Sequence, residues 1–151
     1  MSFYAFKGFD KDLKCRGFQY EVGKTYSMPE KPKICERGYH CCTALSEVFS
    51  YYPPSTWAVD GNIDYFLPVK KFPSGNRYCM VEVCGDIDTD GTAFGFSSKV
   101  ATNSITILQE LTDDDIINIL ETEVLEVKNT LRRIDGIANE FMADVQKKKR
   151  S

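Results

Sequence analysis

Short runs of alternating apolar and polar residues fill the first part of the chain and predict a set of strands. FQYEV places its three apolar residues on one face, and YCMVEVCGDI places Val81 and Val83 on one face with Glu82 on the other. This period of two is typical of a half-buried strand. SITILQEL indicates a third strand, and turn-rich stretches such as MPEKPK and FPSGN separate the runs. Residues 55–76 show no clean period, so we expect a long loop there.

The pattern changes after Leu111, where apolar residues recur at alternating steps of three and four. Thr112 can cap a helix, and three aspartates follow it at the helix end that favours negative charge. An apolar seam with this period is typical of a coiled coil. The seam residues are Ile117, Leu120, Val124, Val127, Leu131, Ile134, Ala138, Phe141 and Val145.

A single helix over residues 113–146 would be about 50 Å long, whereas a domain of about 110 residues is only some 30 Å across. An unbroken helix could not bury its whole seam against its own domain, so we expect a homodimer through the seam. The alternative is packing in cis, which the flanking apolar residues Ile116, Ile137 and Met142 favour. Gly136 is the point at which the helix would bend.

Together these patterns predict an α+β protein. Residues 1–111 would form a small, mostly antiparallel β-sheet domain with one or two short helices. Residues 112–151 would form a long, coiled-coil-like C-terminal helix and a basic tail. A chain of 151 residues is long enough to bury one core.

Composition and charge narrow the classes of function. A hydrophobic content of 42% and a charged content of 27% are those of a globular protein. No apolar run approaches the roughly 20 residues that span a bilayer, and a net charge of -3 argues against broad binding to nucleic acid. The start MSFYAFKGFDKD lacks the basic and apolar segments of a signal peptide. We therefore expect a cytoplasmic protein with reduced thiols and no membrane partner.

The stretch KICERGYHCC holds the only histidine, His40, and several of the six cysteines. A zinc site needs about four ligands, usually in paired short spacings, and Cys35, His40, Cys41 and Cys42 do not offer them. In a strand, Cys41 and Cys42 point to opposite faces. A catalytic Cys–His pair usually joins residues that are distant in sequence. We expect no metal and no thiol catalysis, with the sulfur mostly filling the core.

The residues around and after this stretch predict a strand, a tight turn and a short helix. In TALSEVFSYYPP, Thr43 is a good N-cap and apolar residues follow at helical spacing. Pro53 and Pro54 would stop the helix just after two tyrosines, Tyr51 and Tyr52.

Four blocks occur in a characteristic order: YAFKGFDKDLKCRGFQYEVGKTY, CERGYHCC, VEVCGDID and KVATNSITILQEL. In this order they resemble a family of uncharacterised proteins found in phages, prophages and other bacterial genomes. The resemblance covers most of residues 3–111 and implies a mobile-element setting without an established activity. The C-terminal helix and the loop from Ser55 to Asn76 look like additions to that family.

The order of the blocks also resembles the ADP-ribosyltransferase fold. That resemblance implies a basic residue at the end of the first strand, here Lys7, and then a glycine-aromatic strand, here Gly38 and Tyr39. It also implies a helix bearing a tyrosine that stacks on nicotinamide, and a late glutamate that binds the ribose hydroxyl. GFSSKVATNSITI departs from the pattern, because it has no glutamate and Lys99 is its only charged residue. Without that carboxylate, transfer would lack its main stabiliser of positive charge.

Two functions remain open. The leading one is a non-enzymatic interaction protein that binds and blocks a host protein such as a defence component, in the manner of an anti-CRISPR protein. The alternative is an ADP-ribosyltransferase-like enzyme, or an inactive relative that binds a nucleotide; no cofactor is expected except NAD under this alternative. The candidate ligand-binding residues are Lys7, Arg16, Tyr39, His40, Tyr51, Tyr52 and Lys99.

Overall fold

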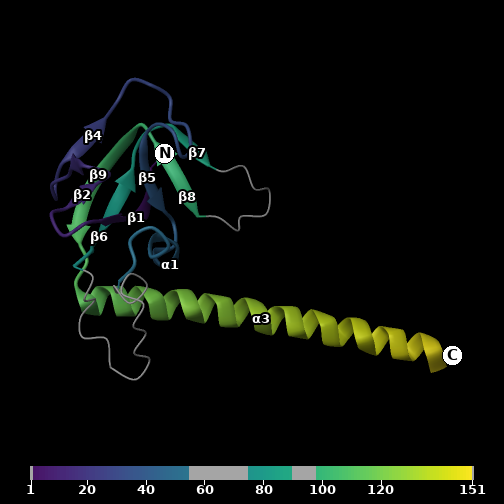
Figure 1. The fold of residues 1–151 in the computed structure, drawn as a ribbon. Coiled ribbons are helices and arrows are strands. Elements are labelled where there is room, and N and C mark those ends of the chain that lie inside the picture. Colours follow the sequence, from purple (N-terminus) through teal and green to yellow (C-terminus); the bar gives the residue numbers. More distant parts are fainter. Residues whose placement is uncertain (1, 55–74, 90–97, 151) are drawn as a thin grey trace, which may run out of the picture. The chain divides into compact units, whose positions relative to one another are not determined.

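The computed structural model describes residues 2–54, 75–89 and 98–150. Its elements are β1 (Phe3–Phe9), β2 (Lys14–Cys15), β3 (Phe18–Gln19), β4 (Thr25–Ser27), β5 (Tyr39–Cys42), α1 (Leu45–Val48), β6 (Arg77–Val83), β7 (Ile87–Thr89), β8 (Lys99–Thr102), β9 (Ser104–Glu110) and α3 (Asp113–Arg150). The chain divides into two compact units, the sheet domain (residues 1–116) and residues 117–151. Figure 1 shows both, and the predicted α+β class is confirmed.

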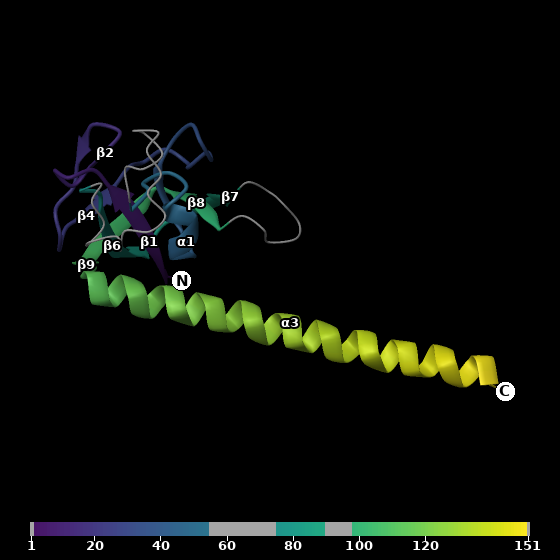
Figure 2. The same ribbon diagram turned by 60° about the horizontal axis from the view of Figure 1, so that its bottom comes forward.

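Strand β1 lies at the centre of a seven-stranded antiparallel sheet with the order β4-β9-β6-β1-β5-β8-β7. All seven residues of β1 pair with β6, whereas only Phe6 pairs with a residue of β5, namely Cys42. The strands β1 and β5 therefore part on either side of this one pairing. Helix α1 packs against both of them (Figures 1 and 2).

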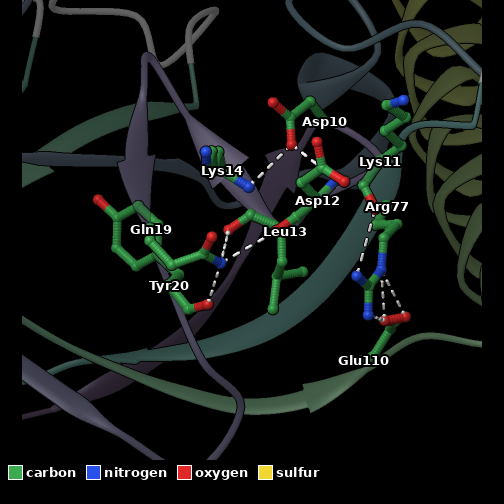
Figure 3. Close-up of polar contacts among 9 residues, drawn as sticks. All are labelled: Asp10, Lys11, Asp12, Leu13, Lys14, Gln19, Tyr20, Arg77 and Glu110. Atoms are coloured by element: carbon green, nitrogen blue, oxygen red, sulfur yellow. Dashed lines mark hydrogen bonds and ion pairs between the residues drawn. The ribbon is translucent and has the colours of Figure 1, made fainter.

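The core lies along the middle strands of the sheet. The alternation predicted for YCMVEVCGDI is confirmed, because Val81 and Val83 are buried and Glu82 is only half-buried. The predicted strand SITILQEL is confirmed as β9. At the rim, Arg77 of β6 forms an ion pair with Glu110 of β9 (Figure 3). The core cluster comprises Ala5, Phe9, Leu13, Tyr20, Cys41, Cys79, Val81, Val83, Val100, Ile105 and Ile107.

The strand predicted over FQYEV is confirmed only at its first two residues, which form β3 as the second strand of a tight hairpin. Arg16 and Gly17 have φ angles of 51° and 80°, and they form the two-residue turn that joins β2 to β3. Positive φ at both positions matches the twist of the two strands. After β3 the chain leaves the sheet, so that Tyr20 is buried while Phe18 and Val22 are exposed.

Two polar side chains hold the loop between β1 and this hairpin, as Figure 3 shows. The Asp10 carboxylate accepts hydrogen bonds from the backbone amides of Asp12 and Lys14, each at 2.9 Å. The side-chain amide of Gln19 donates to the Asp12 carbonyl oxygen at 3.0 Å. These bonds satisfy backbone groups that the sheet does not pair, and they fix the hairpin that carries Cys15.

Helix α1 is shorter than predicted. Its N-cap is Ala44, which has an extended backbone and no side-chain cap, so Thr43 is not the N-cap. The helix ends at Val48, whose carbonyl oxygen then accepts two further backbone hydrogen bonds from the turn that follows. The two prolines therefore lie beyond the end of the helix and do not terminate it.

Helix α3 begins with the predicted Thr112 cap. The Asp115 amide donates to Thr112 Oγ1 at 3.1 Å, and the Thr112 amide donates to Asp115 Oδ2 at 2.9 Å. This reciprocal pair is a capping box in which aspartate takes the usual place of glutamate. The helix continues through Gly136 to Arg150. Within the described ranges, no helix combines the length and apolar content needed to traverse a bilayer.

Candidate functional site

A pocket lies where β1 and β5 part, with an empty space of about 440 Å³ that includes its open mouth. The part of this space that can hold the centre of a water molecule is only about 60 Å³, so the pocket is a shallow recess with an open mouth. We call it the basic pocket. It is lined by Phe6, Lys7, Gly8, Cys15, Arg16, His40, Cys41, Cys42, Val48, Tyr51, Tyr52 and Lys99.

Lys7 is a buried cation on the central strand, only 3% exposed. Its Nζ donates to the His40 carbonyl oxygen at 2.6 Å and lies 3.6 Å from Cys15 Sγ. The rings of Phe9 and Tyr20 lie 5.8 and 5.1 Å from it, within the range of cation–π attraction. None of the ion pairs among the described residues includes Lys7. A carbonyl dipole and two ring faces thus hold this charge in place of a carboxylate.

His40 is neutral and its ring is held by the backbone. Its Nε2 accepts a hydrogen bond from the Cys35 amide at 3.0 Å, so the proton resides on Nδ1. Burial, together with the nearby cations Lys7, Lys99 and Arg16, lowers the pKa of His40 to about 4. The Nε2 lone pair is therefore engaged, and the imidazole serves neither as a base nor as the partner of a thiol.

The two cysteines that follow His40 are buried thiols that stay protonated at neutral pH. Burial raises the pKa of the Cys41 thiol to about 12 and also raises the pKa of Cys42. Thiols that stay protonated are poor nucleophiles and poor metal ligands. Among the described residues, no three histidine, cysteine or acidic side chains come together as a metal site.

Close packing fixes the inner wall of the basic pocket at Gly8. A Cβ at this position would lie 2.7 Å from Tyr52 Cδ2 and 2.8 Å from Val48 Cγ1, so only glycine fits. The Tyr52 hydroxyl donates to Cys15 Sγ at 3.3 Å. Burial and this bond raise the pKa of Tyr52 to about 12. The phenol is therefore a fixed hydrogen-bonding group and not an acid or base.

The rim of the basic pocket carries the other two cations. The Lys99 Nζ lies 4.7 Å from the centre of the Tyr51 ring and 3.1 Å from Cys35 Sγ. Tyr51 is half-exposed. Arg16 is exposed on the hairpin turn, and its charge contributes to the lowered pKa of His40. No described carboxylate lines the pocket, so its lining is positive and partly aromatic.

The structure brings six of the seven candidate ligand-binding residues to this one pocket. The exception is Tyr39, which packs instead in a ring cluster with Phe18, Tyr20 and Tyr26. The three other rings come from β3, from the residue that follows it and from β4, and they meet Tyr39 at the start of β5.

Sequence reasoning missed Cys15 as a member of the pocket. The signal was present in the stretch CRGF, because arginine followed by glycine between two strand residues favours a two-residue turn. Recognising that turn would have placed Cys15 beside Arg16 at the hairpin end.

The described residues thus define a small α+β protein with a basic, ring-lined pocket at the parting of two central strands. The chain belongs to the family described as Domain of unknown function (DUF7666), whose model matches residues 3–119. This match confirms the expected membership of an uncharacterised family, and most of α3 lies beyond it. No curated protein and no solved structure matches the chain.

Proposed function

We propose that the protein is a non-catalytic binding protein whose basic pocket holds an anionic ligand with a planar ring, which is the chemistry of a nucleotide. The charge of the pocket carries the proposal: Lys7, Arg16 and Lys99 line it, and no described carboxylate does. Three cations that line one pocket favour the binding of an anion.

The rim cations suit a phosphate group. Ammonium and guanidinium groups form charge-assisted hydrogen bonds with phosphate oxygens, which are stronger than neutral ones. Lys7 extends the positive charge from the rim into the sheet domain. Burial is the main cause of the lowered pKa of His40, and the charges of Lys7, Lys99 and Arg16 lower it further. A bound anion would relieve this repulsion.

The tyrosines suit the planar part of the ligand. Tyr51 presents a half-exposed ring beside Lys99, and Tyr52 is held in place by Gly8 and Cys15. Stacking of a base on an aromatic side chain contributes about 1–3 kcal/mol. A ligand that carries both a base and a phosphate would use the ring and the cation together.

The resemblance to ADP-ribosyltransferases supports a nucleotide, and the departure from their pattern supports binding without transfer. Those enzymes place a late glutamate where positive charge develops on the ribose. In this chain the described lining from β8 is Lys99, which is a cation. A cation destabilises a developing positive charge where a carboxylate would stabilise it.

Thermal unfolding with millimolar ADP, NAD or pyrophosphate tests the proposal. ADP and NAD should raise the unfolding temperature, because they bind the folded state. Lys99→Gln and Arg16→Gln should each lower the affinity for ADP by about tenfold, which is the effect of losing one charge-assisted hydrogen bond. Lys24→Gln is the matched control, because Lys24 is exposed and pairs with Glu21 outside the pocket.

Three results would count against this proposal. The first is that no nucleotide raises the unfolding temperature of the wild type. The second is that Lys24→Gln lowers the affinity for ADP as much as Lys99→Gln does. If pyrophosphate stabilises the protein as well as ADP does, the ring plays no part and the ligand is a simple polyphosphate.

A second proposed function is the binding and blocking of a host protein, such as a defence component, by a mobile-element protein. The ring cluster favours it. Phe18 is nearly half-exposed, yet its ring makes edge-on contacts with Tyr20, Tyr26 and Tyr39. A rigid, exposed aromatic side chain is the usual anchor of a protein interface.

Affinity capture from a bacterial host, compared between Phe18→Ser and Tyr4→Ser, tests this second function. Tyr4 is the matched control, because it is an exposed aromatic residue outside the ring cluster. A stoichiometric partner that Tyr4→Ser retains and Phe18→Ser loses would support it. If both variants retain the partner, Phe18 is not the anchor. ADP-ribose found on the captured protein would overturn the non-catalytic part of the first proposal.

A further inference from the structure

Helix α3 carries an exposed apolar seam along residues 117–145. Val124, Val127, Leu131, Ile134 and Phe141 are all exposed in the single chain. The hydroxyls of Thr122 and Thr130 donate to the carbonyl oxygens of residues 118 and 126 of their own helix. Helices in water derive most of their stability from packing an apolar face, so this face requires a partner.

The spacing of the seam identifies the kind of partner. Steps of three and four over nine positions repeat every seven residues, so that each seam side chain can enter a hole on a facing helix with the same repeat. A second copy of this chain supplies that repeat by necessity. The first position of the repeat holds the β-branched Ile117, Val124 and Val145, with Leu131 and Ala138 as exceptions. β-Branched residues at this position favour two parallel strands.

The charges beside the seam select the parallel orientation. Two parallel copies would place Glu123 beside Lys128 of the second copy and Asp144 beside Lys149 of the second copy. The other residues that flank the seam would pair Ile137 with Met142 of the second copy and Thr130 with Asp135 of the second copy. No like charges would therefore meet.

An antiparallel pair that overlaps the whole seam is less favourable. It would set Glu123 against Asp144 of the second copy, which is a repulsion, and Lys128 against Asp135 of the second copy, which is an attraction. The two effects offset each other, whereas both charged pairs of the parallel arrangement are attractive.

We propose that residues 117–149 of α3 form a parallel two-stranded coiled coil with a second copy of this chain. The proposal is independent of the basic pocket. Gly136 lies on the outer side of this coil, away from the seam, and a Cβ there would meet nothing within 4 Å. The glycine therefore weakens the helix without interrupting the interface.

Light scattering on the full chain tests the dimer. The wild type should have twice the chain mass of 17.2 kDa at high micromolar concentration. Leu131→Asp should give a monomer whose sheet domain still unfolds cooperatively. Leu125→Asp is the matched control, because the two leucines are 54% and 56% exposed and only Leu131 lies in the seam. A monomeric wild type, or a Leu125→Asp variant that also dissociates, would overturn the proposal.

A charge reversal tests the orientation. Glu123→Lys should weaken a parallel dimer by about threefold to tenfold, since each pair is exposed and occurs twice. Adding Lys128→Glu should restore the affinity. In the antiparallel arrangement, Glu123→Lys would strengthen the dimer instead, because the new lysine would face Asp144 of the second copy. A stronger dimer would therefore contradict the parallel orientation. Unfolding of the sheet domain by Leu131→Asp would show that the seam packs within one chain.

Discussion

The sheet domain and helix α3 differ in how far their apolar side chains are buried. The sheet domain has a core of fully buried large residues such as Phe9 and Tyr78, whereas α3 leaves a row of valine, leucine, isoleucine and phenylalanine side chains exposed beyond Ile116. Both regions have regular hydrophobic patterns. The difference is that a sheet pairs strands from the whole chain and closes its own core, while a single helix offers one face that only another surface can cover. The two regions should therefore respond differently to similar substitutions.

The largest expected effect separates the two cores. Phe9→Ala should lower the free energy of unfolding of the sheet domain by about 3–5 kcal/mol, because it empties a fully buried site. Ile134→Ala should leave that free energy nearly unchanged and weaken only association, since Ile134 is exposed in the single chain. Urea unfolding followed by near-ultraviolet circular dichroism measures the first effect, and light scattering measures the second. If Ile134→Ala destabilised the sheet domain as much as Phe9→Ala, the two regions would share one core.

Two glycines give a smaller contrast with opposite signs. Gly8→Ala should destabilise the sheet domain by about 1–3 kcal/mol, because its Cβ would overlap Val48 and Tyr52. It should also displace Tyr52 from the basic pocket and lower the affinity for ADP. Gly136→Ala should stabilise α3 by about 1 kcal/mol, because it removes the helix cost of glycine in open space. Thermal unfolding and the dimer dissociation constant report the two changes. Destabilisation by Gly136→Ala would mean that another surface covers that side of the helix.

The sheet domain should also show a pH dependence that comes from His40. The unfolded chain protonates His40 near its ordinary pKa of about 6.5, whereas the folded protein holds that pKa at about 4. The unfolded state therefore binds the proton first, and stability falls as the pH falls from about 6.5 to about 4. His40→Gln should show a flatter profile in this window. Equal slopes for the two proteins, measured by urea unfolding at several pH values, would show that His40 is not shifted.

The sequence was sufficient where one local pattern decided the structure. The alternation around Val81 and the aspartates after Thr112 predicted β6 and the start of α3, because burial on one face and helix capping act over a few residues. It failed over most of FQYEV, where the alternation predicts one buried face but the chain turns at Arg16 and Gly17 and leaves Phe18 exposed. A turn with two positive φ angles overrides a weak strand pattern.

The candidate site was predicted in composition but not in geometry. The sequence predicted the basic residues and tyrosines that line the basic pocket. It could not show that β1 and β5 pair at a single position and then separate. That parting depends on partners far apart in the chain. The same limit explains Tyr39, since a strand residue faces whichever rings the rest of the fold brings to it.

The titration of His40 followed by NMR is the most direct test of the claim that the basic pocket binds an anion. The chain has a single histidine, so its imidazole resonances are unambiguous. We predict a pKa of about 4 in the free protein, a higher value in Lys99→Gln, and a rise when ADP is added, because a bound anion stabilises the imidazolium. A pKa near its ordinary value of about 6.5, unchanged by ADP and by Lys99→Gln, would contradict the claim.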